Sequence, residues 1–373
     1  MTGQFGVSGS EEERHWPALT EAEARAVLAG YPLCAPFHKL VWHSPRPFSA
    51  AAQARLQDGS SLFIKRHHAA LRPVAALEAE HRFIAHLIRH DVPAAAPLLR
   101  QDGHSATQSA AFTFEVFPAA PGEDRYRETH SWQPFRGPDD ARAAGAMLAR
   151  LHLAAASFSE PGRGDIPLIS GFSSLKKLSL TEGILAWAPT QPGLDRSLAA
   201  RTGWQADAES ALGRFHVRLF PLLPGLRPSW GHGDWHGSNL LWTGQGQGQV
   251  ASIIDFGMSG RTTAGFDLAV AIERSMVAWL DPHRPVARES LDAFFEGYLS
   301  LRTPDTQEQE EILAFLPLVH VDFALSELAY FDHLVQDRAS GEVAWSAYLL
   351  GHARWFASDA GQALTDRVAA LLR

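Results

Sequence analysis

The stretch from Trp230 to Leu268 reads WGHGDWHGSNLLWTGQGQGQVASIIDFGMSGRTTAGFDL. Within it, two short apolar runs at 240–242 and 250–254 flank a turn of glycines and glutamines, a pattern that predicts a β-hairpin. In an antiparallel hairpin the start of the first strand lies beside the end of the second. Asn239, just before the first run, and Asp255, just after the second, are therefore expected at one end of the hairpin. Together they suit Mg²⁺, which takes a few oxygen ligands and completes its shell with water and phosphate.

A further acidic residue precedes the predicted hairpin. The string His232-x-Asp234-x-x-x-x-Asn239, with Asp255-Phe-Gly after it, has the spacing of the catalytic loop and metal motif of kinases. In that arrangement the first aspartate accepts a proton from the attacking hydroxyl, and the asparagine and second aspartate hold the metal ions that bridge the phosphates. The whole pattern, His-Gly-Asp-x-His-x-x-Asn, then Ile-Asp-Phe-Gly and an Asp-Leu-Ala from Asp267, resembles the aminoglycoside phosphotransferase and choline kinase-like family of small-molecule kinases.

The resemblance extends from Phe37 to Phe331 and implies an α+β, two-lobed protein kinase-like fold with a small β-rich N-lobe and a mostly helical C-lobe. We accordingly expect an N-terminal arm with a short helix at 1–36, an N-lobe at 37–120, and a C-lobe at 121–373 with the catalytic loop and acceptor site. The resemblance also implies ATP as phosphoryl donor, Mg²⁺ as metal and a small-molecule hydroxyl as acceptor. Aminoglycosides, amino alcohols, homoserine-like compounds and sugars all remain open as acceptors.

The N-lobe segment begins with a second hairpin signal. Runs at 50–56 and 61–66 flank Asp58-Gly59, a pair typical of tight hairpin turns. Lys65 lies on the second strand, on the same face as Phe63. A lysine on the buried face of a strand is costly unless it is paired, so an acidic partner is expected.

The predicted helix 73–90 offers that partner. Glu80 precedes Phe83 and Ile84 by three and four residues, so it falls on the apolar stripe of the helix. A carboxylate on that face requires a cation, and we predict that Glu80 orients Lys65 for contact with the phosphates, as in kinases. The alternative is that Lys65 extends its ammonium into water and Glu80 caps another group.

Two more segments are expected to contact the nucleotide. The segment 44–52 has no glycine, unlike a glycine-rich phosphate loop, but Ser49 can donate a hydrogen bond to a phosphate. The apolar run 111–117 is followed by proline and, by the resemblance, is the hinge between the lobes. There the carbonyl of Glu115 and the N–H of Phe117 would meet the adenine edge. The same run also fits an edge strand that is ended by proline.

Several stretches of the C-lobe are expected to be helical. Alanine-rich or apolar periodic patterns predict helices over 139–156, 265–280, 291–301, 311–335 and 344–372. Asp267 stands at the start of the second of these, where it is expected to cap the helix. The resemblance implies that it also braces the catalytic loop.

The composition narrows the class of protein further. The net charge of the 373 residues is −8, and no cluster of Lys and Arg points to nucleic acid. Cys34 is the only cysteine, so no internal disulfide is possible and a reducing cytoplasm fits. No signal pattern or long apolar run predicts contact with a membrane. The sequence sets no oligomeric state.

Three other functions fit parts of the pattern. A catalytically silent nucleotide-binding module would keep the same fold. His232, Asp234 and His236 could bind zinc or iron in a metallohydrolase, although that leaves the oxygen ligands around the hairpin without a role. A protein kinase is disfavoured, because Gly233 replaces the arginine that reads a phosphorylated activation loop and no Ala-Pro-Glu segment follows.

Overall fold

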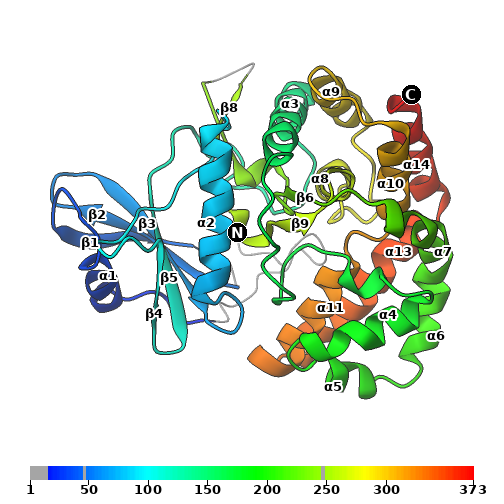
Figure 1. Ribbon diagram of the computed structural model, residues 1–373, viewed down its shortest axis with the longest axis horizontal. Helices are drawn as coiled ribbons and strands as arrows, with labels where there is room; N and C mark the ends of the chain where they lie inside the picture. The colour runs from blue at the N-terminus through cyan, green and yellow to red at the C-terminus, as the bar shows by residue number, and fades with distance from the viewer. Residues whose placement is uncertain (1–15, 45–47, 245–247) are drawn as a thin grey trace.

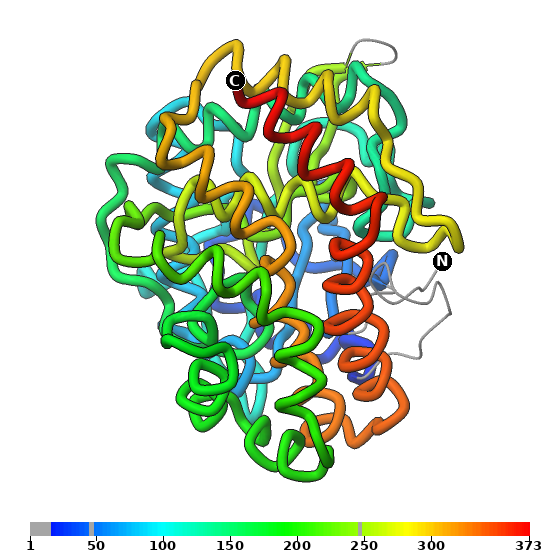
Figure 2. The backbone as a smooth tube through the Cα atoms, turned by 90° about the vertical axis from the view of Figure 1, so that its right-hand side faces the viewer, coloured from blue at the N-terminus to red at the C-terminus, as the bar shows by residue number. Residues whose placement is uncertain are grey.

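The computed structural model describes residues 16–44, 48–244 and 248–373, which form two lobes (Figure 1). The smaller lobe contains a five-stranded antiparallel sheet with the order β1-β2-β3-β5-β4. Its strands and its first helix are β1 (Phe37–His43), β2 (Ala50–Leu56), β3 (Ser61–His68), β4 (Ala106–Ser109), β5 (Phe112–Pro118) and α1 (Glu21–Leu28). Figure 2 looks at the molecule from the helical side, with the blue sheet behind the green and red helices.

The larger lobe is mostly helical, as the resemblance implied. Its helices are α3 (Pro138–Ala155), α4 (Leu180–Trp187), α5 (Leu194–Ala199), α6 (Trp204–Ala208), α7 (Arg214–Leu219), α8 (Ala264–Met276), α9 (Arg288–Leu299), α10 (Thr306–Phe315), α11 (Val321–Ala329), α12 (Arg338–Glu342), α13 (Leu350–Phe356) and α14 (Asp359–Leu371). Two small sheets complete it, one of β6 (Ser229–Gly231) with β9 (Gly260–Thr262) and one of β7 (Leu240–Trp242) with β8 (Val250–Ile253). The predicted α+β architecture, with a small β-rich lobe and a mostly helical one, is therefore confirmed.

The strands of both predicted hairpins pair as expected. Gly59 has φ +87°, a conformation that glycine adopts at little cost, and the carboxylate of Asp58 accepts a hydrogen bond from the N–H of Ser60 at 2.9 Å. In the second hairpin Leu240 pairs with Ile253. This register places the residues just outside the hairpin, at 239 and 255, next to each other.

Helix α2 (Val74–Arg89) crosses between the lobes and packs into the core of the larger one (Figure 1). The ring of Phe83 lies 5.3 Å from that of Phe158 and 5.2 Å from that of Trp230. The apolar stripe of α2 therefore faces the C-lobe. The core under the sheet is a separate cluster, made mainly by α1, β2, β3 and β5.

Both ends of α2 are also bonded to the C-lobe. Before the helix, the guanidinium of Arg72 donates to the carbonyls of Pro167 at 2.7 Å and Leu168 at 2.6 Å. After it, the carbonyl of Pro93 accepts a hydrogen bond from the N–H of Ile253 at 2.8 Å, and the carbonyl of Ile253 accepts one from the N–H of Ala95. The helix is thus fixed to the lobe that holds the catalytic loop.

Two of the predicted helices are interrupted. The stretch 311–335 is divided between α10 and α11, and the residues between them, 316–320, are buried. Because the apolar pattern runs through the break, periodicity did not reveal it. The stretch 344–372 is divided at Ser358, whose hydroxyl caps α14. None of the helices in the described ranges is both long enough and apolar enough to cross a bilayer.

Candidate active site

The loop 231–239 between β6 and β7 is held by a buried carboxylate. Asp267 accepts hydrogen bonds from the N–H of His232 at 2.9 Å and of Gly233 at 2.7 Å. His152 contacts the same carboxylate at 3.0 Å. Burial raises the pKa of Asp267, but these hydrogen bonds and the charge of His152 outweigh burial and lower it. The predicted bracing role is confirmed, whereas the predicted capping role is wrong, because the hydroxyl of Thr263 caps α8.

We expect Asp267→Asn to lower the free energy of unfolding by about 3 kcal/mol, because an amide NH₂ would face a backbone N–H in a buried site. The lowered pKa means that this stabilisation is fully present above the ordinary pKa of an aspartate and is lost as the pH falls through the lowered one. The variant should therefore also lose the acid-side pH dependence that Asp267 contributes. Chemical denaturation at several pH values measures both effects. Asp292→Asn, which breaks an exposed pair with Arg367, is the control and should cost under about 1 kcal/mol.

Gly233 takes a conformation that other residues avoid. Its φ is +74°, and a Cβ at this position would lie 2.2 Å from the carbonyl oxygen of Met258. The loop therefore requires glycine where protein kinases carry arginine. The close approach brings the loop against the segment that follows Asp255.

We expect Gly233→Ala to destabilise the fold by more than the roughly 1–3 kcal/mol of backbone strain alone, because the new Cβ also meets a carbonyl. Gly203→Ala is the matched control. Gly203 has φ +80° but nothing within 4 Å of its hypothetical Cβ. Equal melting temperatures for the two variants would contradict the predicted steric contact.

Asp234 lies at the centre of the site, surrounded by donors. Its Oδ1 accepts hydrogen bonds from the indole N–H of Trp132 at 2.9 Å and from the guanidinium of Arg274. Its Oδ2 accepts from the amide nitrogen of Asn239 at 3.0 Å. Burial alone would raise the pKa of Asp234, but the charges of His236 and Arg274 outweigh it and hold the pKa well below its usual range. Asp234 is therefore an ionised, oriented carboxylate.

Asn239 and Asp255 present oxygen atoms beside Asp234. The side-chain contacts of Asn239 to Asp234 use its amide nitrogen, so they leave the amide oxygen for another partner. Asp255 has φ +59°, an uncommon conformation for a residue other than glycine, and its side chain is 52% exposed. Lys65 lies 3.1 Å from its Oδ1, and the charge of this lysine lowers the pKa of Asp255. Both predicted metal ligands, Asn239 and Asp255, thus line the same cavity as Asp234.

One cavity joins these residues. Its lining combines polar groups from the loop with apolar side chains from both lobes, and consists of Phe48, Ser49, His67, Leu71, Arg72, Ser131, Trp132, Leu168, Asp234, His236, Asn239, Asp255, Gly257, Met258 and Phe323. Asp234, Asn239, Asp255 and Ser49 are therefore brought together, with Lys65 bonded to one of them. Part of the predicted phosphate-covering segment, 45–47, lies outside the described residues.

The predicted ion pair between Lys65 and Glu80 is not formed. Glu80 lies 2.9 Å from a guanidinium nitrogen of Arg163, and Lys65 contacts Asp255. Glu80 does lie on the apolar stripe of α2, as predicted, but that stripe faces the C-lobe and not the sheet. Arg163 also donates to the carbonyl of Gly257 at 3.0 Å, so it links α2 to the loop after Asp255.

Glu115 and Phe117 lie inside the sheet. They are opposite Lys65 and Phe63 of β3. The carbonyl of Val116, which lies between them, points away from β3 and accepts a hydrogen bond from the N–H of Leu98. Since backbone groups alternate along an antiparallel strand, those of Glu115 and Phe117 point toward β3. This arrangement does not favour the predicted adenine contact through these two positions.

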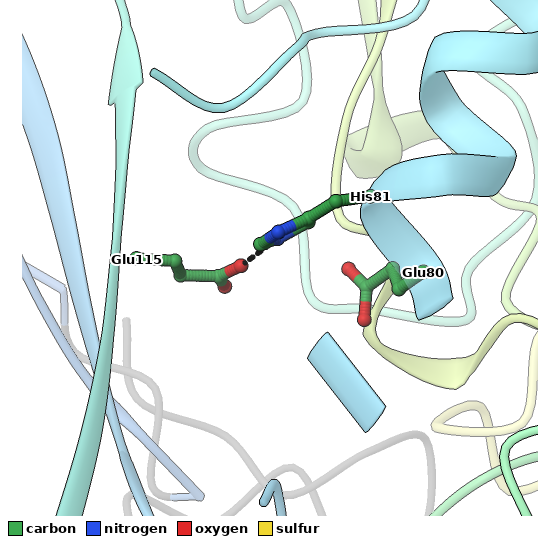
Figure 3. A group of neighbouring side chains, drawn as sticks. All are labelled: Glu80, His81 and Glu115. Atoms are coloured by element: carbon green, nitrogen blue, oxygen red, sulfur yellow. Dashed lines mark hydrogen bonds and ion pairs between the residues drawn. The ribbon is translucent and has the colours of Figure 1, made fainter. Parts of the chain in front are cut away.

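The side chain of Glu115 is bonded to two imidazoles. Nε2 of His81 lies 2.6 Å from one of its oxygens, and Nε2 of His67 lies 3.0 Å from the other. Figure 3 marks the contact between His81 and Glu115 with a dashed line. Burial raises the pKa of Glu115, but these hydrogen bonds outweigh it and hold the pKa well below its usual range. Within the described ranges, one group of three residues brings possible metal-ligand atoms close together, and it consists of Glu80, His81 and Glu115. Their carboxylates already have partners, Arg163 for Glu80 and the imidazoles for Glu115.

The alternative metal cluster is not supported. His232 uses both ring nitrogens, Nδ1 to accept from the N–H of Asp234 at 3.2 Å and Nε2 to meet the carbonyl of Ile254 at 3.1 Å. Its burial lowers its pKa. Nδ1 of His236 contacts the hydroxyl of Ser238 at 2.9 Å. These histidines orient the loop, and neither ring nitrogen of His232 is left for a metal.

Sequence reasoning missed four residues that shape the site, namely Trp132, Arg163, His67 and Arg274. Two of them carried a usable signal. His67 lies two residues after Lys65 on β3, hence on the same face. Arg274 lies seven residues after Asp267 in a mostly apolar, buried helix, hence on the same side of it. A charge in such a helix requires a partner. Trp132 and Arg163 lie in irregular segments whose pattern gave no signal.

Comparison with known proteins agrees with this geometry. Residues 46–312 match the model of the phosphotransferase enzyme family, and the chain belongs to that family. An uncharacterized protein of Deinococcus radiodurans is 28% identical over 339 residues, which cover 88% of this chain and 86% of that relative.

Solved structures show the same fold. A microcompartment-associated aminopropanol kinase has a TM-score of 0.63 and 19% identity, covering 92% of this chain and 99% of that one. An amicoumacin kinase in complex with AMP-PNP, Ca²⁺ and Ami has a TM-score of 0.57 and 18% identity, covering 87% of this chain and 92% of that one. The fold and the family together define the protein as a phosphotransferase with a two-lobed kinase-like fold. The resemblance found in the sequence is therefore confirmed.

Proposed function

We propose that the protein transfers the γ-phosphoryl group of ATP to a hydroxyl group of a small molecule. The observation that carries the proposal is the convergence of Asp234, Asn239 and Asp255 on one cavity, with Lys65 bonded to Asp255. Kinase catalysis consists mainly of positioning and charge neutralisation, and these residue types supply both.

Asp234 is the proposed catalytic base. Its ionised carboxylate orients the acceptor hydroxyl and takes its proton as the oxygen bonds to the γ-phosphorus. The bond between that phosphorus and the bridging oxygen breaks, and ADP leaves. The hydrogen bond from Asn239 to Oδ2 limits the rotation of the carboxylate, so the hydroxyl meets a fixed acceptor.

Asn239 and Asp255 are the proposed ligands of Mg²⁺. One amide oxygen and one half-exposed carboxylate at the cavity fit an ion that prefers oxygen and keeps several waters. When bound, the ion supplies positive charge to the phosphates. Lys65 would then exchange Asp255 for a phosphate oxygen. Burial opposes its charge, but the charges of Asp255, Glu115 and Glu80 raise its pKa, so the lysine stays protonated.

The remaining nucleotide contacts are assigned to Ser49, to the backbone after β5 and to the surroundings of Glu80. Ser49 lines the cavity and is a proposed hydrogen-bond donor to the phosphates. We place backbone contacts with adenine after the end of β5, from Ala119 onward, because the backbone groups of Glu115 and Phe117 point toward β3. Glu80 acts through Arg163 on the loop after Asp255, and through its charge on Lys65.

The cavity favours compact acceptors over polycations. Its described lining has two carboxylates, and each already has a cation as partner, Arg274 for Asp234 and Lys65 for Asp255. Aromatic and aliphatic side chains such as Trp132 form much of the rest. Amino alcohols, homoserine-like compounds and sugars therefore fit better than aminoglycosides with several ammonium groups.

The test is ADP release from MgATP across a panel of metabolites and antibiotics. Release that depends on one acceptor class, with the phosphorylated product found by mass spectrometry, would support the proposal. Nucleotide binding without ADP release on any acceptor would favour the silent module instead. The single cysteine, Cys34, is free and exposed, which suits an activity in a reducing cytoplasm.

A further inference from the structure

We propose that Arg274 is a positioning residue for phosphoryl transfer, which fixes Asp234 through Oδ1 and so leaves Oδ2 to meet the acceptor hydroxyl. The inference rests on the proposed function, because it assigns a role within the same site. Arg274 belongs to no part of the kinase pattern in the sequence. It comes from helix α8, behind the catalytic loop.

Helix α8 holds the catalytic loop at two points. Asp267, in its first turn, accepts from the backbone N–H groups of His232 and Gly233. Arg274, two turns later on the same side, donates to the carbonyl of Gly233 at 2.9 Å and to Oδ1 of Asp234. Asp267 therefore accepts hydrogen bonds from the loop and Arg274 donates hydrogen bonds to it. Arg274 also contacts the carboxylate of Asp234, the proposed base.

The two oxygens of Asp234 have different surroundings. Oδ1 accepts from Trp132 and Arg274, and Nε2 of His236 lies 3.4 Å away. Within the part of the chain that the structure describes, Oδ2 has one side-chain donor, Asn239. A carboxylate oxygen has about two lone-pair sites, so Oδ1 is filled while Oδ2 keeps one. Because Trp132 and Arg274 occupy Oδ1, Oδ2 is the oxygen that receives the proton of the acceptor hydroxyl.

Arg274 is itself held rigidly. It is 1% exposed, its second terminal nitrogen donates to the hydroxyl of Ser170 at 3.3 Å, and Glu273 lies 3.9 Å from its Nε. Its guanidinium lies 4.5 Å from the ring of Trp132 and 5.5 Å from that of Phe323. A planar fork can stack on a ring and donate in several directions at once, which a lysine ammonium cannot do.

The backbone conformation of Trp132 is independent support for a specific arrangement of Trp132, Arg274 and Asp234. Its φ is +59°, a left-handed conformation that is rare for a bulky residue and persists only where the surroundings enforce it. In this conformation the indole N–H meets Asp234 while the ring face meets Arg274. The backbone strain and the ring contact both serve the same carboxylate oxygen.

The experiment compares Arg274→Lys and Arg274→Gln with the unaltered full-length chain. With the acceptor found in the panel, or water if none is found, we expect kcat for ADP formation to fall roughly 10²-fold, the usual effect of a small misplacement of a reacting group. The KM for MgATP should stay nearly constant, because Arg274 does not reach Lys65 or Asp255. Arg274→Lys should recover little, since the charge alone does not restore the fork.

A second readout does not depend on turnover. The indole N–H resonance of Trp132, assigned with Trp132→Phe, reports its hydrogen bond to Asp234 and should shift or broaden in both Arg274 variants. Arg201→Gln is the control, because it breaks a partly buried pair with Asp332 outside the cavity. It should leave kcat and this resonance unchanged.

The outcomes separate the two proposals. If kcat falls no further in the Arg274 variants than in Arg201→Gln, or if the Trp132 resonance stays in place, the positioning role is wrong. If the unaltered chain forms no ADP with any acceptor or water, the proposed function fails. The Trp132 resonance then still decides whether Arg274 orients Asp234.

Discussion

Replacing Asp234 with asparagine is expected to lower the rate of phosphoryl transfer by roughly 10²–10⁴-fold, the usual contribution of a positioned general base. The donors around Oδ1, Trp132 and Arg274, require an oxygen at that position. The amide oxygen of the new asparagine would therefore turn toward them. Its NH₂ group would replace Oδ2, so the acceptor hydroxyl would meet a donor instead of a proton acceptor.

Affinity for MgATP should change far less than turnover in this variant. Lys65 and Asp255 are untouched, and Asn239 loses its bond to Oδ2 but keeps its hydrogen bond to the backbone carbonyl of residue 234 at 2.8 Å. Single-turnover ADP formation measures the first effect, and calorimetric titration with MgATP measures the second. Asp292→Asn is the control for loss of a carboxylate elsewhere. A variant of Asp234 with undiminished turnover on the true acceptor would count against its role as the base.

Replacing Asp255 with alanine is expected to weaken MgATP binding by more than the 10–100-fold that removal of an outer-sphere partner typically costs, because a metal ligand itself is lost. The ion pair between Lys65 and Asp255 gives this variant a second signature. Without its partner, Lys65 is free to meet phosphates at once. Binding of ATP in the presence of a chelator should therefore be unchanged or tighter.

The comparison of the two titrations is the decisive measurement for Asp255. Loss of a metal ligand would weaken binding of MgATP but not of metal-free ATP, whereas loss of a residue that only supports the loop would weaken both. Equal MgATP affinity in the variant and the unaltered chain would refute Asp255 as a metal ligand.

Local sequence spacing was sufficient for the catalytic loop. Asp234, Asn239 and Asp255 converge because the hairpin between them is short, and its register follows from an apolar pattern and a glycine-rich turn. The strand that carries Lys65 and the helix that carries Glu80 were also predictable. In each case the residues that decide the geometry lie within one supersecondary unit.

Contacts between distant segments were not predictable in the same way. Periodicity shows that Glu80 shares a face with Phe83, but not which neighbouring surface that face meets, and it meets the C-lobe. Arg163 and Trp132 approach the site from irregular segments far along the chain. Such partners are selected by the packing of the whole molecule, which no local spacing encodes.

The attachment of α2 determines which parts of the molecule can move when nucleotide enters. Arg72 and Pro93 anchor the two ends of the helix to the C-lobe, while His81 also ties it to Ser105 and to Glu115 of β5. Opening of the cleft by a tilt of the sheet and α1 over the helix would therefore break the contacts of His81. The flexing joints would be the chain between β3 and Arg72, the chain from Ala95 to β4, and the exit from β5.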